Sequence, residues 1–142
     1  MEFWKDKSRN QLDPELFSTK AEEIAKEINA ERLQSRGKAN KPTQIRNFYE
    51  EVLRFDSMLK TSPGEFDNML PYLKMINAKV AYAVGRDLVT SKFKDFISNS
   101  LKQVKDKEDF NAFAGLFEAF MGYYKFYCEK KEQRQFSQGG RR

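Results

Sequence analysis

The apolar residues of this chain recur at helical spacing along nearly its whole length, and no segment alternates convincingly with a period of two. The few glycines and prolines fall where the helical pattern breaks. The pattern predicts five helices joined by short links, at residues 13–35, 43–60, 65–85, 89–104 and 108–131. Because each helix then buries one apolar stripe, we expect an all-α fold, a single five-helix bundle.

The bundle domain should occupy residues 1–134, and the basic segment QFSQGGRR at residues 135–142 has the composition of a disordered tail. Asp13 and Pro14 predict the start of the first helix, because aspartate caps a helix and proline fits its first turn. The apolar face of this helix should consist of Phe17, Ala21, Ile24 and Ile28.

Histidine, on which many catalytic sites depend, is missing, and cysteine is rare. The chain has no histidine and one cysteine, Cys128, which excludes His-based triads, His-ligated zinc and internal disulfides. The sequence has no glycine-rich phosphate loop and no clustered carboxylate motif, so we expect no catalysis, no metal and no cofactor. Cys128 follows an aromatic stripe that is more often core than cofactor site, and this stripe consists of Phe110, Phe113, Phe117, Phe120 and Tyr124.

The sequence suggests neither a signal peptide nor a bilayer span. The N-terminal MEFWKDKSRN lacks an apolar run, and no stretch is apolar for long enough to cross a bilayer. The absence of disulfides fits a reducing compartment. We therefore expect a soluble cytoplasmic protein with no membrane partner.

The net charge of +5 is unevenly distributed. Residues 35–46 hold four basic residues and no acid, and residues 125–142 hold six basic and two acidic residues. These two segments carry +8, which leaves −3 for the rest of the chain. Such a surplus favours a polyanion partner, nucleic acid first and anionic lipid second. A basic loop and tail that only aid solubility are the alternative.

The second helix begins with cations, although helix starts usually carry acids. In KANKPTQIRNFYEEV, residues 38–52, the first acid is Glu50. The basic residues before this acid are Arg36, Lys38, Lys41 and Arg46. With Thr43 as the cap, the free N–H groups of the first turn and these cations predict a phosphate site. The alternative is ordinary threonine capping, with Arg46 paired to Glu50.

The third predicted helix carries a stripe of two cations and a tyrosine opposite its core face. At 100° per residue, the core face should consist of Met69, Leu73, Ile76, Val80 and Val84. Lys79, Tyr82 and Arg86 fall together on nearly the opposite side, where charge for phosphates and a flat ring for unstacked bases suit single-stranded nucleic acid. The alternative is a tyrosine packed against a neighbouring helix between two extended cations. Pro71 predicts a kink, or a fresh start near Met69.

We expect the basic entrance of the second helix and the stripe of the third to merge into one exposed cationic track. Several segments in this region and beyond it also resemble a known family. In order, TQIRNFYEEV, LPYLKMINAKVAYAVGR, FKDFI and FNAFAGLFEAFMGYYKF resemble the small α-helical subunit of type III-A CRISPR effector complexes, the Csm small-subunit family. The resemblance covers roughly residues 41–127 and rests on the combination more than on any one segment.

This resemblance implies a non-catalytic subunit of an antiviral ribonucleoprotein complex, whose copies line up as a filament beside the backbone and large subunits. Its basic face would contact the backbone of single-stranded target RNA along the groove formed by the guide RNA–target duplex. By motif, the residues assigned to this contact are Lys41, Arg46, Lys79 and Arg86, with Tyr82 in the same motif. The candidates on charge alone are Arg36, Lys38, Lys74 and the tail arginines.

Two other functions stay open. A helical protein–protein adaptor without nucleic-acid binding would use exposed aromatic residues, and the candidates are Phe3, Trp4, Phe55 and Phe136. A DNA-binding helix-turn-helix protein would use the link after Lys60 as its turn. The helix that follows this link lacks Arg, Gln or Asn early enough to read bases, which makes this function the weakest of the three.

Overall fold

The computed structural model describes the backbone of residues 1–140 and the side chains of residues 1–130. Within this range six α-helices dominate, one more than predicted, because the third predicted segment is divided in two. They are α1 (Ala21–Gln34), α2 (Pro42–Thr61), α3 (Phe66–Lys74), α4 (Ile76–Gly85), α5 (Ser91–Lys102) and α6 (Lys107–Gly140). The smaller elements are β1 (Trp4–Asp6), η1 (Lys7–Arg9), β2 (Gln11–Leu12), η2 (Leu16–Lys20) and η3 (Pro63–Glu65).

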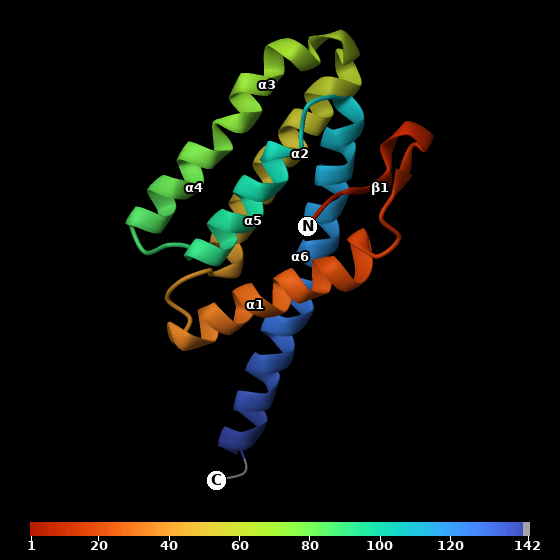
Figure 1. Ribbon diagram of the computed structural model, residues 1–142. Coiled ribbons are helices and arrows are strands. Elements are labelled where there is room, and N and C mark those ends of the chain that lie inside the picture. The colour runs from red at the N-terminus through yellow and green to blue at the C-terminus, as the bar shows by residue number, and fades with distance from the viewer. Residues whose placement is uncertain (141–142) are drawn as a thin grey trace.

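The α-helices form a bundle whose long segments alternate in direction (Figure 1). In the view of Figure 1, α2 runs upward, α3 and α4 run back down in succession, α5 runs upward and α6 runs down. The helix α1 crosses the lower part of this bundle and packs on α6, while α4 packs beside α5. The predicted all-α bundle is therefore confirmed, and α3 and α4 form one of its outer edges.

The core is centred on the aromatic stripe of α6, as the sequence predicts. All five residues of that stripe are buried. The ring centroid of Phe117 lies 5.3 Å from that of Tyr49 on α2 and 5.6 Å from that of Phe96 on α5. Aromatic pairs of this kind contribute roughly 0.5–1.5 kcal/mol beyond the burial of their surface. One helix face thus fixes the positions of both α2 and α5.

The third predicted segment has the expected core face, but its break lies later than expected. The buried residues are Met69, Leu73, Ile76 and Val80, with Val84 half-buried against them. Pro71 lies inside α3, and the helix restarts at Ile76 rather than near Met69. The N–H of Met75 is shared between the carbonyls of Pro71 and Tyr72, at 3.1 and 3.2 Å, and this tightened turn separates α3 from α4.

The N-terminal residues form a β-hairpin that the sequence does not predict. β1 pairs antiparallel with β2, and Trp4 lies opposite Leu12. Strands of three and two residues are too short to show a clear period of two. Contacts with α6 and the residue before it hold the hairpin: Trp4 Nε1 donates to Asp109 Oδ1 at 2.7 Å, and Lys7 Nζ lies 2.7 Å from Asp106 and 2.9 Å from Asp109.

The start of the first helix differs from the prediction. Asp13 does cap a turn, since it accepts the Glu15 N–H at 2.8 Å, but one wide turn of π-helix follows and α1 starts only at Ala21. The wide turn shifts the register of the side chains that precede α1. Phe17, predicted in the core face, is therefore 42% exposed, and its ring lies against Gly115 of α6.

Most of the aromatic residues proposed as exposed partner contacts are not exposed. Phe3 and Phe55 are buried and Trp4 is half-buried, because the hairpin lies on α6 and because Phe55 faces the inner side of α2. Phe136 lies outside the residues whose side chains are described. The adaptor hypothesis therefore loses the first three of its predicted contacts, although other aromatic residues are exposed.

The last helix is longer than predicted, since α6 continues to Gly140 beyond the expected end near residue 131. The disordered tail predicted for residues 135–142 falls outside the described side chains and stays a prediction, as does the domain boundary at residue 134. Among the described residues, no helix combines the length and the apolar character that crossing a bilayer requires.

Candidate nucleic-acid interface

Three exposed side chains on and just after α4 form a stripe, here called the α4 stripe, which consists of Lys79, Tyr82 and Arg86. Tyr82 is 65% exposed, so it does not pack against a neighbouring helix as the alternative interpretation required. The Arg86 guanidinium lies 5.7 Å from the centre of the Tyr82 ring, and Arg86 Nη1 donates to the Tyr82 hydroxyl at 3.2 Å. This cation–π contact places a positive charge next to an open aromatic face.

The α4 stripe lies in a stretch without acids, since residues 68–86 contain three basic residues and no Asp or Glu. The carboxylate that meets Lys79 comes from α2: Lys79 Nζ lies 2.7 Å from Glu51 Oε1, and Arg54 Nη2 lies 2.9 Å from the same oxygen. The hydrogen bond from Lys79, with the one from Arg54, holds the pKa of Glu51 below its usual value. Two cations sharing one carboxylate leave this network with a net positive charge.

Lys74, also a candidate, is half-buried at the end of α3 and is not part of the stripe.

The second predicted cluster lies at the start of α2, but Thr43 does not cap this helix. Pro42 is the first helical residue, and Lys41 occupies the cap position with no side-chain hydrogen bond. Proline lacks an N–H and has a fixed φ, so it favours a start one residue earlier than predicted. Lys41 and Arg46 are both exposed, and no acid lies in the first turn. Arg46 Nε lies 3.2 Å from Glu50 Oε1, which is the pair that the alternative interpretation predicted.

The basic loop before α2, residues 35–41, is held in place by one buried side chain. Asn40 Oδ1 accepts the N–H of Thr90 at 3.0 Å, and Asn40 Nδ2 donates to the Thr90 hydroxyl at 2.9 Å. Asn40 and Arg36 adopt φ values of 57° and 59°, a left-handed conformation that asparagine tolerates better than most residues. With Asn40 anchored inside, the loop leaves Arg36 and Lys38 exposed.

The two cationic groups do not merge into one uninterrupted track, which corrects the sequence prediction. Arg46 pairs with Glu50 and Lys79 pairs with Glu51, so two neighbouring acids of α2 lie between the groups. Arg46 and Lys125 line a hollow of about 290 Å³ between α2 and α6, so Arg46 lies on the side of α2 that borders α6. At 100° per residue, positions 46 and 51 of α2 point about 140° apart, so only the latter faces α4.

Two exposed residues that sequence reasoning missed extend the α4 stripe toward α3. Tyr72 is 63% exposed and Met75 is 49% exposed, and they precede Lys79 by seven and four residues. This i, i+3, i+7 spacing was present in the sequence. The spacing alone did not identify these residues, because whether Tyr72 and Met75 are exposed depends on what packs against α3.

Metal-binding residues do not gather in the described part of the chain, where no three His, Cys, Asp or Glu side chains could hold an ion together. Cys128 is buried, with its Sγ 3.5 Å from Asn29 Oδ1. The exposed residues of the α4 stripe and of the α2 start offer positive charge and, at Tyr82, a flat aromatic surface. Both are what a flexible polyanion with stacking bases requires.

The model of the family described as Csm2 Type III-A matches residues 11–130, a range that includes both cationic groups. The searches of curated proteins and of solved structures return no match.

Proposed function

The chain belongs to the Csm2 Type III-A family, whose members are small subunits of type III-A CRISPR effector complexes, and from this we propose that it is a non-catalytic, RNA-binding subunit. In this proposal it contacts the backbone of target RNA along the guide–target groove, as part of antiviral defence. Contacts to the backbone do not depend on base sequence, so they suit a subunit that must accept any target the guide selects.

The observation that carries the proposal is the exposure of the α4 stripe, whose helix carries no acid and whose contact with Glu51 is shared with a second cation, Arg54. The ring of Tyr82 is 65% exposed, and a cation lies on either side of it along the helix. Phosphates would contact Lys79 and Arg86, and a base would stack on Tyr82 between them. One base–aromatic stack contributes ~1–3 kcal/mol.

The start of α2 supplies a second proposed contact. Arg46 and Lys41 would hold a phosphate there, with Arg36 and Lys38 of the basic loop nearby. The exposed Arg46–Glu50 pair does not prevent this, because exposed ion pairs of this spacing are weak, so Arg46 can exchange Glu50 for a phosphate at little cost. Since the α4 stripe and the cations at the start of α2 are separate, the RNA would contact the protein at two sites rather than along one cationic track.

The proposed partners follow from membership of the family, which implies association with other subunits of the complex. We expect the backbone and large subunits to hold the protein next to target RNA, and further copies of the chain to align as a filament. Each copy contributes few phosphate contacts, so binding by the isolated protein should be weak. Repetition along the filament would then raise the overall affinity.

The test is the salt dependence of RNA binding by the full chain, measured by fluorescence anisotropy with a labelled single-stranded RNA of about 12 nucleotides. Each phosphate contact adds ~0.7 to the slope of log affinity against log salt concentration. Arg86→Ala and Arg46→Ala should each lower the slope by about that amount, whereas Arg9→Ala, an exposed arginine on the hairpin, should not. If neither of the first two substitutions changes affinity or slope, the site assignment is wrong.

A protein–protein adaptor is the second candidate function, and a specific surface favours it. A hollow of about 510 Å³ on α6 is lined by Phe17, Gly122 and Phe126, and the two phenylalanine side chains are 42% and 51% exposed. An adaptor without nucleic-acid binding would show no anisotropy change with RNA even at low salt. It would instead bind a protein partner through this hollow, and Phe126→Ala would weaken that binding while the fold stays intact.

A further inference from the structure

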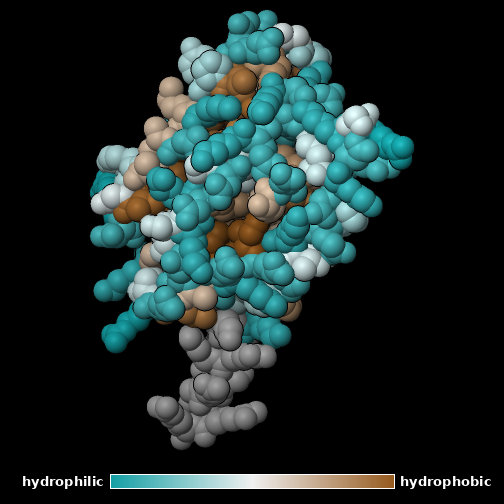
Figure 2. All heavy atoms as spheres, in the orientation of Figure 1, coloured by the Kyte–Doolittle hydropathy of each residue, from teal (hydrophilic) through white to brown (hydrophobic). Residues whose placement is uncertain are grey.

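The exposed stripe of α4 continues onto α3 with unbroken spacing. Its residues are Tyr72, Met75, Lys79, Tyr82 and Arg86, which alternate by three and four positions. The two helices follow one another along one edge of the bundle, and Figure 2 shows light brown, apolar atoms along this edge within a mostly hydrophilic surface. The face therefore presents two exposed tyrosines, ten residues apart, on a stretch that contains no acid.

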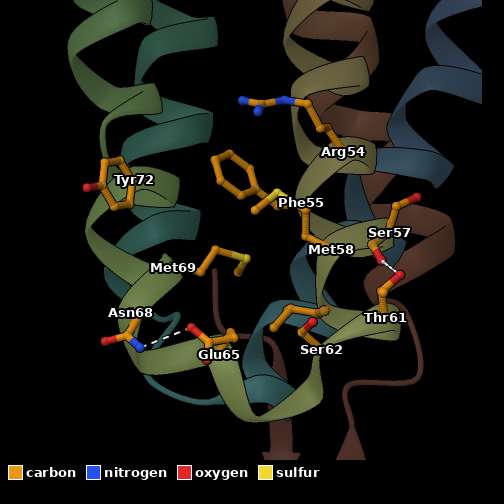
Figure 3. Close-up of a pocket in the computed structure, with 11 residues that line it drawn as sticks. Arg54, Phe55, Ser57, Met58, Thr61, Ser62, Glu65, Asn68, Met69 and Tyr72 are labelled. Atoms are coloured by element: carbon orange, nitrogen blue, oxygen red, sulfur yellow. Dashed lines mark hydrogen bonds between the residues drawn. The ribbon is translucent and has the colours of Figure 1, made fainter.

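The tyrosine at the α3 end borders a hollow of about 710 Å³ between α2 and α3. Figure 3 shows Tyr72 on one side of this hollow, with Phe55 and Met58 pointing toward it from α2. Met69 contributes to the floor, and the guanidinium of Arg54 extends over the same space. The walls are thus aromatic and thioether groups, which suit the face of a planar ring. The rim carries donors and acceptors, and its one carboxylate, Glu65, accepts a hydrogen bond from Asn68 Nδ2 at 3.0 Å.

A cationic bridge connects this hollow with the α4 stripe. Arg54 lines the hollow, and Lys79 belongs to the stripe, and both bind the same oxygen of Glu51. The Arg54 guanidinium also lies 5.0 Å from the centre of the Phe55 ring. Since two positive charges share one negative charge, the surface between the two tyrosines keeps a positive excess. A polyanion can therefore pass from one ring to the other without meeting an unpaired acid of this network.

We propose that the RNA-binding face extends from Tyr82 to Tyr72, and that the hollow beside Tyr72 takes one unstacked base of the same single strand. This inference rests on the proposed function. At a helical rise of 1.5 Å per residue, the ten residues from Tyr72 to Tyr82 correspond to about 15 Å along α3 and α4, or roughly four stacked base steps of 3.4 Å. The rings therefore hold two bases that are not neighbours, and the phosphates between them run past Lys79.

The test compares two labelled oligouridines in anisotropy titrations of the full chain. One has about 12 nucleotides and reaches both rings, and the other is a trinucleotide, whose two base steps are too short to bridge them. Tyr72→Ala should weaken binding of the long strand at least about fivefold and weaken binding of the trinucleotide less, because a trinucleotide still binds at Tyr82. Tyr72→Phe, which keeps the ring, should restore binding. Tyr82→Ala should weaken binding of both strands.

The outcomes separate this inference from the proposed function. If Arg86→Ala weakens binding of the long strand but Tyr72→Ala does not, the extension is overturned and the proposed function stands. If the unmodified chain binds neither oligouridine at low salt, the proposed function fails and the extension with it. If Tyr72→Ala changes the sedimentation of the protein alone and not its RNA affinity, the surface is a protein contact and the extension is overturned. Circular dichroism of each variant checks that the fold is retained.

Discussion

Replacing Asp109 by asparagine would test how the N-terminal hairpin is fixed to the bundle. This carboxylate is 1% exposed and accepts hydrogen bonds from Trp4 Nε1 at 2.7 Å, from the Lys105 N–H at 3.0 Å and from the Asp106 N–H at 3.3 Å. In return, Asp106 Oδ1 accepts the Asp109 N–H at 2.8 Å, so the two acids form a reciprocal cap at the start of α6.

Asparagine keeps one oxygen for Trp4 but turns an amide NH₂ group toward the backbone donors. The variant thereby loses two hydrogen bonds to a charged acceptor, from the Lys105 and Asp106 N–H groups, and each such bond is worth about 1.5–3 kcal/mol. The bond from Asp106 is the longer of the two, so we assign it the lower value of about 1.5 kcal/mol. We expect the free energy of unfolding at pH 7 to fall by about 3–4.5 kcal/mol. Asp95→Asn, at an exposed position of α5, is the matched control and should change it by less than about 0.5 kcal/mol.

The same substitution should remove a pH dependence. Burial alone would raise the pKa of Asp109, but hydrogen bonds from Lys7, Trp4 and the Lys105 N–H outweigh it and hold the pKa below its usual value. The stabilisation is therefore present above the unfolded-state pKa of about 3.9 and is lost as pH falls through the lower folded-state value. The difference between the original chain and Asp109→Asn should shrink over this acidic range.

The assay is urea denaturation followed by tryptophan fluorescence, because the chain contains a single tryptophan, Trp4, which contacts Asp109 directly. Measurements at pH 7 and at several lower values give both the size of the effect and its pH dependence. A loss below about 0.5 kcal/mol at pH 7, or a difference that stays constant down to pH 3, would refute the role assigned to this carboxylate.

Two further substitutions test the site and its support. Glu51→Gln removes the carboxylate shared by Lys79 and Arg54, so affinity for single-stranded RNA should rise several-fold at low salt in an anisotropy titration; an unchanged affinity would contradict the placement of RNA over this network. Asn40→Ala removes the acceptor of the Thr90 N–H and places alanine at a φ of 57°, so urea denaturation should show a loss of about 2–4 kcal/mol. Asn40→Gly should lose less, and equal losses in both variants would exclude a contribution from backbone strain.

The helices and most of the core could be predicted from the sequence, because both depend on local periodicity. The stripe of α6 that includes Phe117, and the core face that includes Leu73, follow from apolar residues three and four positions apart. The same periodicity placed Tyr82 on the opposite, exposed face, which the structure confirms. Its contact with RNA stays a prediction, since exposure alone does not identify what covers a ring.

Features that depend on distant contacts could not be predicted. Trp4 and Asp109 are 105 residues apart, and no local pattern announces their hydrogen bond or the hairpin that it holds. Whether Arg46 and Lys79 lie on one cationic track depends on how α2 is rotated about its axis in the bundle, and periodicity within one helix does not reveal this rotation. The late restart of the helix at Ile76 depends on how the turn after Pro71 tightens, which no pattern within the segment shows.

Photo-crosslinking of the full chain to single-stranded RNA that contains a photoreactive uridine would test the central claim most directly. Mass spectrometry of the digested complex identifies the peptides that touch the bases. The account predicts crosslinks within residues 72–86, strongest at Tyr82 and lost in Tyr82→Ala. Crosslinks confined to other segments, such as the N-terminal hairpin or α5, with none in residues 72–86, would contradict it.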